Sequence, residues 1–252
     1  MTGLRAFLRK ECRETLRTWR IWVLPSLLAF FALTGPITAR YTREIVSMAM
    51  GSPALAATLP EPTYLDAYTQ WTKNLGQMAL FAIIISLGSC VSGEVRQGTA
   101  TLVLTKPLSR TAFILAKVIA HSAFVVLATT AGALLTWAVT RVVFPRAPIV
   151  PLVQATAAWL LLAGLFVAIM VLASSLVSSA AGAAGLGLLA LMVLALASVW
   201  TPARLGPPGL VGLPDRLLAG DQGTTWAPLV SSVVLIGLVL GAAIVRFRRV
   251  EI

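Results

Sequence analysis

The segment from Gly93 to Lys117 brings an unusual number of polar side chains together between two long apolar runs. Its short apolar centre, Leu102 to Leu104, is flanked by charge. An exposed apolar element with a charged rim is typical of a docking surface. The chemistry that this segment suggests is therefore recognition of a partner. Its charged residues are Glu94, Arg96, Lys106, Arg110 and Lys117.

The order of residues in this segment predicts its local structure. The apolar run before it can continue as a helix to Gly98, because glycine suits a left-handed helix end. Thr99 can then cap a short helix, which Pro107 terminates, since the residue before proline disfavours the helical region. Ser109 can cap the next long helix, and Lys117, two turns into it, is expected to extend towards the cytoplasm.

Residues for catalysis or metal binding are sparse. The single histidine, His121, has no carboxylate near it in sequence, and we find no protease motif and no phosphate-binding loop of the Gly-x-x-x-x-Gly-Lys-Ser/Thr type. Cys12 and Cys90 lack metal-ligand spacing. Met48 and Met50 suggest a soft copper site as an alternative, although flexible apolar packing also explains them. We predict neither a catalytic residue nor a metal site.

The composition shows which elements must position the docking segment. The chain has 252 residues, of which 58% are hydrophobic and only 12% are charged, against about 25% charged in soluble domains. A membrane-spanning helix needs about 20 mostly apolar residues. We therefore predict an all-α integral membrane protein that forms one transmembrane domain, residues 1–252. Its six spans are expected at about residues 21–40, 76–93, 112–140, 152–176, 179–200 and 226–246.

The distribution of basic residues predicts the topology. With the N-terminus in the cytoplasm, 13 of the 20 Lys and Arg residues lie inside and seven outside. This bias matches the positive-inside rule and predicts two cytoplasmic termini. The net charge of +11 then reflects topology and contact with anionic lipid, so we expect no nucleic-acid partner.

The flanking segments complete the prediction. Residues 1–20 form an amphipathic helix in the membrane interface, where arginines meet lipid headgroups. Trp71 is expected in an aromatic belt outside the second span, and residues 201–228 in a hydrophobic external hairpin. Small residues in span 179–200 suit close helix packing, either within the chain or against another copy. The interfacial residues that we single out are Arg9, Arg13, Arg17 and Trp19.

The pattern Glu94-x-x-x-Gly98-Thr99, followed by Leu102 to Leu104 and by Lys106-Pro107-Leu108-Ser109-Arg110, resembles the cytoplasmic motif of ABC-2-type exporter permeases. The resemblance implies that the short helix is a coupling helix that docks on an ATP-binding subunit, with the turn between spans four and five as a second contact. It assigns the first contact to Glu94, Arg96, Gly98, Thr99, Leu102, Val103, Lys106, Pro107, Ser109 and Arg110, and the second to Ser174, Ser175 and Ser178.

The resemblance further implies two permease copies, two ATP-binding subunits that carry ATP and Mg²⁺, and a location in the inner or plasma membrane. This chain would bind no cofactor and would not be an enzyme by itself. An apolar pathway would favour a lipid-like or drug-like cargo. The alternatives are a scaffold that recruits a cytoplasmic partner, a permease of a copper-processing ABC system, and a metal-ion or small-solute channel.

Overall fold

The computed structural model describes residues 2–17, 20–51, 57–99, 109–221 and 223–249, and every regular element in these ranges is helical. Six helical stretches there are long and apolar enough to cross a membrane. The predicted all-α membrane fold with six spans is confirmed. The stretches are Trp22–Arg40, Tyr64–Arg96, Arg110–Val143, Val150–Leu176, Ala180–Val199 and Trp226–Arg248.

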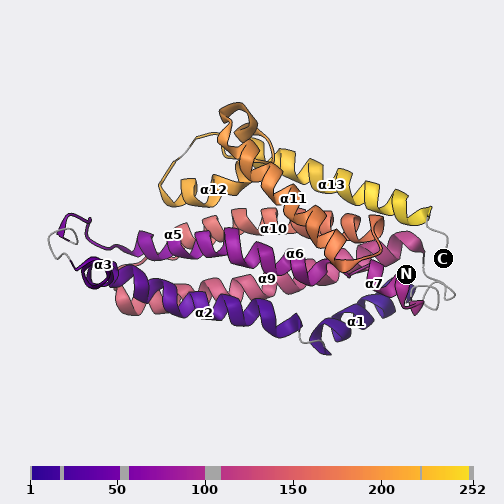
Figure 1. The fold of residues 1–252 in the computed structure, drawn as a ribbon, viewed down its shortest axis with the longest axis horizontal. Coiled ribbons are helices and arrows are strands. Elements are labelled where there is room, and N and C mark those ends of the chain that lie inside the picture. Colours follow the sequence, from indigo (N-terminus) through magenta and orange to yellow (C-terminus); the bar gives the residue numbers. More distant parts are fainter. Residues whose placement is uncertain (1, 18–19, 52–56, 100–108, 222, 250–252) are drawn as a thin grey trace.

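The spans run side by side in an elongated bundle, and the two chain ends lie at the same end of it (Figure 1). The second span is built from several helices in succession, whereas the others are single helices. The spans are α2 (Arg20–Arg40), α5 (Tyr64–Asn74) with η1 (Leu75–Ala79), α6 (Leu80–Leu87) and α7 (Ser92–Arg96), then α9 (Arg110–Val143), α10 (Val150–Leu176), α11 (Ala180–Val199) and α13 (Trp226–Arg248).

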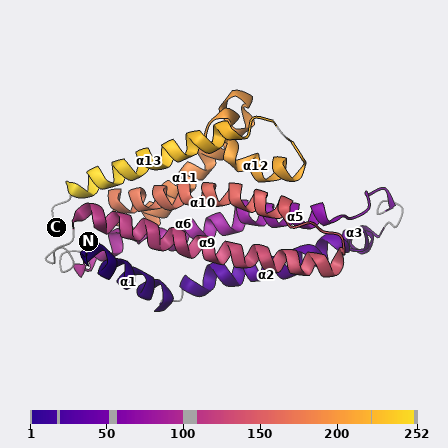
Figure 2. The same cartoon turned by 180° about the vertical axis from the view of Figure 1, so that it is seen from behind.

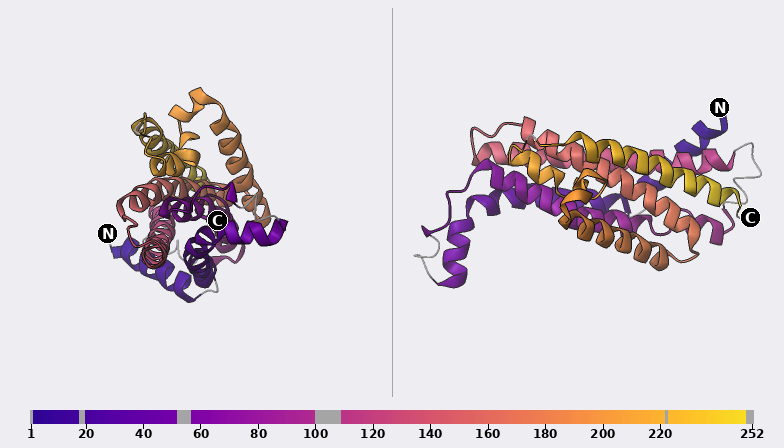
Figure 3. Two further views of the ribbon diagram at one scale, coloured as in Figure 1. Left: turned by 90° about the vertical axis from the view of Figure 1, so that its left-hand side faces the viewer. Right: turned by 90° about the horizontal axis from the view of Figure 1, so that it is seen from above.

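Among the described residues, four shorter helices flank the bundle. They are α1 (Thr2–Arg17), α3 (Thr42–Met50), η2 (Thr201–Leu205) and α12 (Gly209–Leu218). The helix α1 lies at the end that carries the termini, beside α2 and α9 (Figure 2). The helix α3 lies at the opposite end and points away from the bundle axis (Figure 3). The bundle therefore has two different ends, which we call the terminal end and the distal end.

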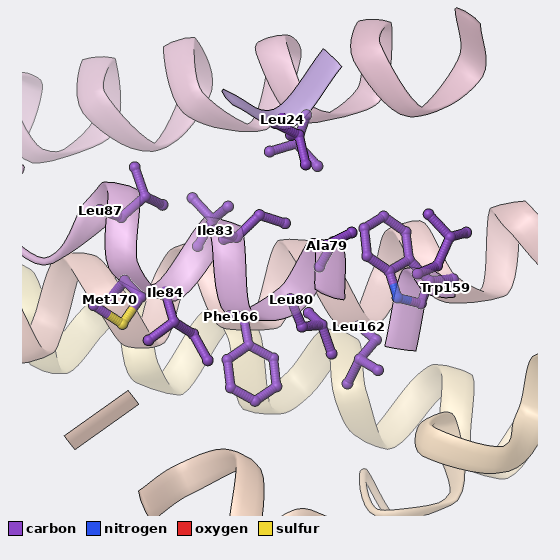
Figure 4. Close-up of a cluster of buried hydrophobic side chains, with 14 of the residues drawn as sticks. Leu24, Ala79, Leu80, Ile83, Ile84, Leu87, Trp159, Leu162, Phe166 and Met170 are labelled. Carbon is purple, nitrogen blue, oxygen red and sulfur yellow. The ribbon is translucent and has the colours of Figure 1, made fainter. Parts of the chain in front are cut away.

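The core is centred on α10, which packs against α6, α9, α11, α12 and α13. Its side chains Leu162, Phe166 and Met170 meet Leu80 and Ile84 of the second span (Figure 4). In the apolar 18-residue stretch of α10, 67% of the residues are buried inside the protein. In the corresponding stretch of α11, only 11% are buried. Because lipid tails are as apolar as leucine, close van der Waals packing holds such helices together.

The second span begins earlier than predicted. Thr63 and Asp66 form a capping box, which satisfies two backbone donors at the start of α5. Trp71 is 1% exposed, and its indole N–H donates to Thr156 Oγ1 at 3.3 Å. The expected position of Trp71 in an aromatic belt is therefore wrong, because its polar edge finds a partner inside the bundle.

The segment after α11 is partly buried. Its helix α12 packs on α10, and its side chains Leu210 and Leu213 have no exposed surface. Thr72 of α5 donates a hydrogen bond to Asp215 Oδ1 at 2.6 Å. The apolar composition of this segment is thus explained by a face that covers α10, together with a hydrogen bond to the second span.

Candidate functional site at the terminal end

The docking segment enters and leaves the bundle at the terminal end. Gly98 has a φ of +71°, which is the left-handed conformation predicted for it. Ser109 Oγ accepts a hydrogen bond from the backbone N–H of Ala112 at 3.1 Å, so its predicted capping of α9 is also confirmed. The hydroxyl of Thr99 donates to the carbonyl of Glu94 at 3.2 Å and closes the end of α7. Residues 100–108, with Leu102, Val103, Lys106 and Pro107, lie outside the described residues.

A cluster of five charged side chains joins α1, α7 and α9 beside this segment. Lys117 Nζ lies 3.1 Å from Glu11 Oε2 and 3.2 Å from Glu94 Oε1. Lys10 pairs with Glu94 as well, with Glu11 at 3.1 Å and with Glu14 at 2.6 Å. The two lysines thus bridge three carboxylates from two separate parts of the chain. We call these five residues the ionic cluster.

The centre of the ionic cluster is buried. Lys117, Glu11 and Glu94 are 2%, 3% and 7% exposed. The predicted extension of Lys117 towards the cytoplasm is therefore wrong. A buried ammonium is tolerated only with good partners, and the two carboxylates supply them. The carboxylate of Glu94, which was expected to contact a partner protein, faces these lysines instead. Arg96, two residues later, is exposed.

The outer charges of the cluster stabilise one another. Burial opposes the charge of Lys10, but its hydrogen bonds to Glu14 and Glu94 and the charge of Glu11 raise its pKa above the usual range. Burial likewise opposes ionisation of Glu14, but its hydrogen bond to Lys10 and the charge of Lys10 lower its pKa below 4.5. Both groups therefore stay ionised near neutral pH.

Three stacked phenylalanines extend the same contact. The ring of Phe113 lies 5.0 Å from that of Phe7 and 4.9 Å from that of Phe247, between centroids. They link α1, α9 and α13, and Lys117 Nζ lies 5.1 Å from the Phe113 centroid, within cation–π range. The guanidinium of Arg110 donates to the backbone carbonyls of Phe247 at 3.2 Å and Arg248 at 2.8 Å.

The helix before the docking segment is interrupted, although we predicted it to be continuous to Gly98. A Cβ on Gly88 would lie 2.6 Å from the carbonyl oxygen of Ala180, so glycine allows the chain to pass close to the start of α11. The interruption frees the backbone N–H groups of Val91 and Ser92. Both donate to Ser174 Oγ at 3.0 Å. Ser174 is 1% exposed, so its hydroxyl oxygen is a hydrogen-bond acceptor inside the protein.

Of the other two residues predicted for the second contact, Ser175 is half-buried and Ser178 is exposed. Ser175 and Ser178 line a groove of about 320 Å³ together with Arg96 and Arg246. The structure therefore brings the turn between α10 and α11 beside α7, and contact of either with a partner stays a prediction. On α1, Arg9, Arg13 and Arg17 are exposed, while Trp19 lies outside the described residues.

The sequence did not direct us to Glu11, although a spacing signal was present. Phe7, Glu11 and Glu14 recur at i, i+4 and i+7, which places them on one face of α1. Phe113 and Lys117 show the same i, i+4 spacing on α9. An acidic group on the aromatic face of an otherwise basic helix indicates a buried cationic partner.

The described residues thus form six apolar spans, and contacts of Glu94 and Arg110 hold the two sides of the segment between α7 and α9. The chain matches the ABC-2 family transporter proteins over residues 5–208, and it belongs to this family. It is also similar to the uncharacterized transmembrane protein YxlG of Bacillus subtilis (strain 168). The two are 27% identical over 266 aligned positions, which cover all of this chain and 99% of that protein.

Proposed function

We propose that this chain is the permease subunit of an ATP-driven ABC-2-type exporter and that residues 98–110 dock on a separate ATP-binding subunit. The observation that carries the proposal is the anchoring of this segment on both sides. Before it, Glu94 is tied to Lys10 and Lys117. At its last residue, Arg110 donates a hydrogen bond to the backbone carbonyl of Arg248 at the end of α13. ATP and Mg²⁺ would bind to the partner and not to this chain.

The anchors give a push on the segment a route into the spans. A displacement of Glu94 acts on Lys117 of α9 and, through Lys10 and Glu11, on α1. A displacement of Arg110 acts on α13 through the two carbonyl contacts. Because packed helices transmit strain, nucleotide-driven motion of the partner would tilt α9 and α13 together.

The active unit would hold two permeases and two ATP-binding subunits. The helix α11 supports a pair of permeases. Most of its residues are exposed, and its small residues are divided between two faces. Ala183 and Gly187 are buried against the chain's own core, whereas a Cβ on Gly185 would meet nothing within 4 Å. The free face would pack on a second copy. Both termini would lie in the cytoplasm, at the inner or plasma membrane.

Co-expression with a candidate ATP-binding subunit, sought in the reading frames beside this gene, tests the proposal. The two chains should purify together, and Val103→Asp should abolish the association because it puts a charge in the apolar centre of the docking segment. Met48→Asp is the matched control, since Met48 is 82% exposed on α3 at the distal end. It should leave the complex intact. Equal behaviour of both variants would contradict the docking role, and a stable complex without transport-linked ATP hydrolysis would indicate a scaffold.

A further inference from the structure

The groove of about 320 Å³ at the terminal end lies between α7, the turn after α10 and the end of α13. The three spans that form it end at Arg96, Leu176 and Arg248. The groove is therefore at the level where the bundle leaves the apolar core of a bilayer. Lipid headgroups occupy this level on either side of a membrane, so the position of the groove does not depend on which side the terminal end faces.

The charged side chains that line this groove are all positive. Among the described residues, Arg96 of α7 and Arg246 of α13 line it, and no Asp or Glu does. Both arginines are exposed, and the ion pairs of the described residues involve neither of them. The groove thus holds two positive charges for which the described part of the chain supplies no counterion.

The end of α13 directs its arginines to different sides. Arg248 donates a hydrogen bond to Thr111 Oγ1 of α9 at 3.0 Å. Arg246 precedes it by two residues, which places it on roughly the opposite side of a helix with 3.6 residues per turn, and there it lines the groove. Arg248 therefore joins two helices of the bundle, whereas Arg246 faces a space that a ligand can enter.

The groove continues into apolar surface. Phe247 is buried where it lines the groove, and Leu176 at its edge is 49% exposed. On α13, the exposed residues Leu238 and Ala242 precede Arg246 at i−8 and i−4. The helices α11 and α13 both pack on α10, and they lie apart at the terminal end (Figure 1, Figure 3). The surface beside α13 therefore suits an acyl chain whose headgroup lies in the groove.

We propose that this groove binds the headgroup of an anionic phospholipid. The phosphate lies between the guanidinium groups of Arg96 and Arg246, because a guanidinium presents several N–H donors in a plane that matches phosphate oxygens. The hydroxyl of exposed Ser178 adds a neutral donor, and the acyl chains lie along α13. Basic pockets between spans near the membrane surface are typical of such lipid sites. The bound lipid links α7 to α13.

A soluble anion or an acidic side chain of a partner protein fits the same groove less well. Either would meet the two arginines, but it would leave Leu176 and the apolar face of α13 without a contact. A phospholipid supplies a negative charge and apolar chains in one molecule, at the level of the membrane where the groove lies. The proposal requires no ATP-binding subunit and does not depend on export.

Three probes test the proposal on the purified full-length chain in an uncharged detergent: dioleoylphosphatidylglycerol, dioleoylphosphatidylcholine and glycerophosphoglycerol. Bound lipid is counted by native mass spectrometry, and saturation is followed by the shift in melting temperature. The anionic lipid should bind at one site per chain. The zwitterionic lipid should bind about tenfold or more weakly, because its choline group opposes the arginines. The headgroup without acyl chains should not saturate the site. Equal binding of the two lipids, or of the free headgroup, would overturn the proposal.

Variants then locate the site. Arg96→Gln combined with Arg246→Gln should weaken binding of phosphatidylglycerol about tenfold or more. Arg40→Gln combined with Arg146→Gln removes the same charge from exposed positions of the distal end and should leave this binding unchanged. The control separates the groove from the general attraction of a basic protein for anionic lipid. Binding that is weakened equally by both pairs of substitutions, or by neither pair, would overturn the assignment.

The same double variant tests the alternative of a protein contact. If Arg96→Gln with Arg246→Gln loses association with the candidate ATP-binding subunit but keeps phosphatidylglycerol, the groove is a protein contact and the lipid site is rejected. Lipid binding is measured without that subunit, so its loss leaves the association test through Val103→Asp unaffected. An intact complex without a lipid site would reject the groove proposal and retain the exporter.

Discussion

The two ends of the bundle are held together by different physical means. At the terminal end, Lys117 lies between Glu11 and Glu94 inside the protein. Towards the distal end, large aromatic side chains fill the space between helices, and the polar atoms of Trp71 and Tyr68 meet neutral oxygens. Trp71 donates to Thr156 there, and the Tyr68 hydroxyl donates to the carbonyl of Pro148 at 2.8 Å.

This difference separates an end of the bundle that can respond to a change of charge from an end that supports the fold. Close-packed aromatic contacts are insensitive to the charge state of their surroundings, and they resist small displacements. A buried ionic cluster depends on its charge balance, because removal of one lysine leaves three carboxylates with a single cation. The terminal end, next to the proposed docking segment, is therefore where a partner would change the balance of forces.

The largest expected effect comes from Lys117→Met. The substitution keeps the approximate volume of the side chain but removes the buried cation between Glu11 and Glu94, so the three carboxylates of the cluster keep Lys10 as the one cation within it. We expect a loss of about 3–5 kcal/mol in the free energy of unfolding, measured by thermal or denaturant unfolding of the purified protein. The matched control is Lys73→Met, since Lys73 is exposed on α5 and its loss should change little.

A double substitution sharpens this test. In Lys117→Met with Glu11→Gln, one uncompensated carboxylate is removed together with the lysine. The double variant should be more stable than the sum of the two single effects predicts, since neighbours in one network are coupled. Additive effects would mean that Lys117 stabilises the fold through packing alone, and the comparison between the two ends would then lose its basis.

Ser174→Ala should have the next largest effect. It leaves the backbone N–H groups of Val91 and Ser92 without their acceptor, in a place that is closed to water. We expect a loss of about 2 kcal/mol in unfolding free energy, together with faster hydrogen exchange at these two amides. Ser178→Ala, in the same turn but exposed, is the control. A similar result for both variants would contradict the structural role of Ser174.

Trp71→Phe probes the distal half and should have a smaller effect. A single aromatic ring remains, but the hydrogen bond to Thr156, about 1 kcal/mol, is lost together with part of the packing of the larger indole. Trp22→Phe serves as its control, because Trp22 is 73% exposed. A loss comparable to that of Lys117→Met would show that the distal packing is as sensitive as the ionic cluster, and the proposed division between the two ends would not hold.

Local features of the fold could be predicted from the sequence because they depend on neighbouring residues. The six apolar runs, the left-handed Gly98 and the cap at Ser109 follow from composition, glycine freedom and hydroxyl chemistry at helix ends. The family pattern from Glu94 to Arg110 also lies within one short segment. In each case, the residues that determine the feature are adjacent in the chain.

Other features depend on which helices meet, and single-residue rules misjudged them. A lysine near the end of a span usually extends to water, but Lys117 meets Glu11 because α1 folds back on α9. A tryptophan near a span end usually lies in the interface, but Trp71 meets Thr156 from a different helix. Ser174 was predicted to be a surface contact, but it accepts hydrogen bonds from two backbone N–H groups that the helix break after Leu87 leaves free. At that break, α11 approaches Gly88 closely, and this approach could not be seen in the local sequence.

The smallest predicted effect concerns pH at the outer edge of the ionic cluster. The pKa of Glu14 is lowered below 4.5 in the folded protein, so its stabilising contribution is present above pH 4.5 and is lost as the pH falls through the lowered pKa. The difference in melting temperature between the native chain and Glu14→Gln should therefore shrink below pH 4.5. Because Glu14 is half exposed, the effect at neutral pH is that of a surface ion pair, about 1 kcal/mol or less. The same comparison with Glu61→Gln corrects for general effects of acid, and a difference that grows on acidification would show that Lys10 does not hold Glu14 in its charged form.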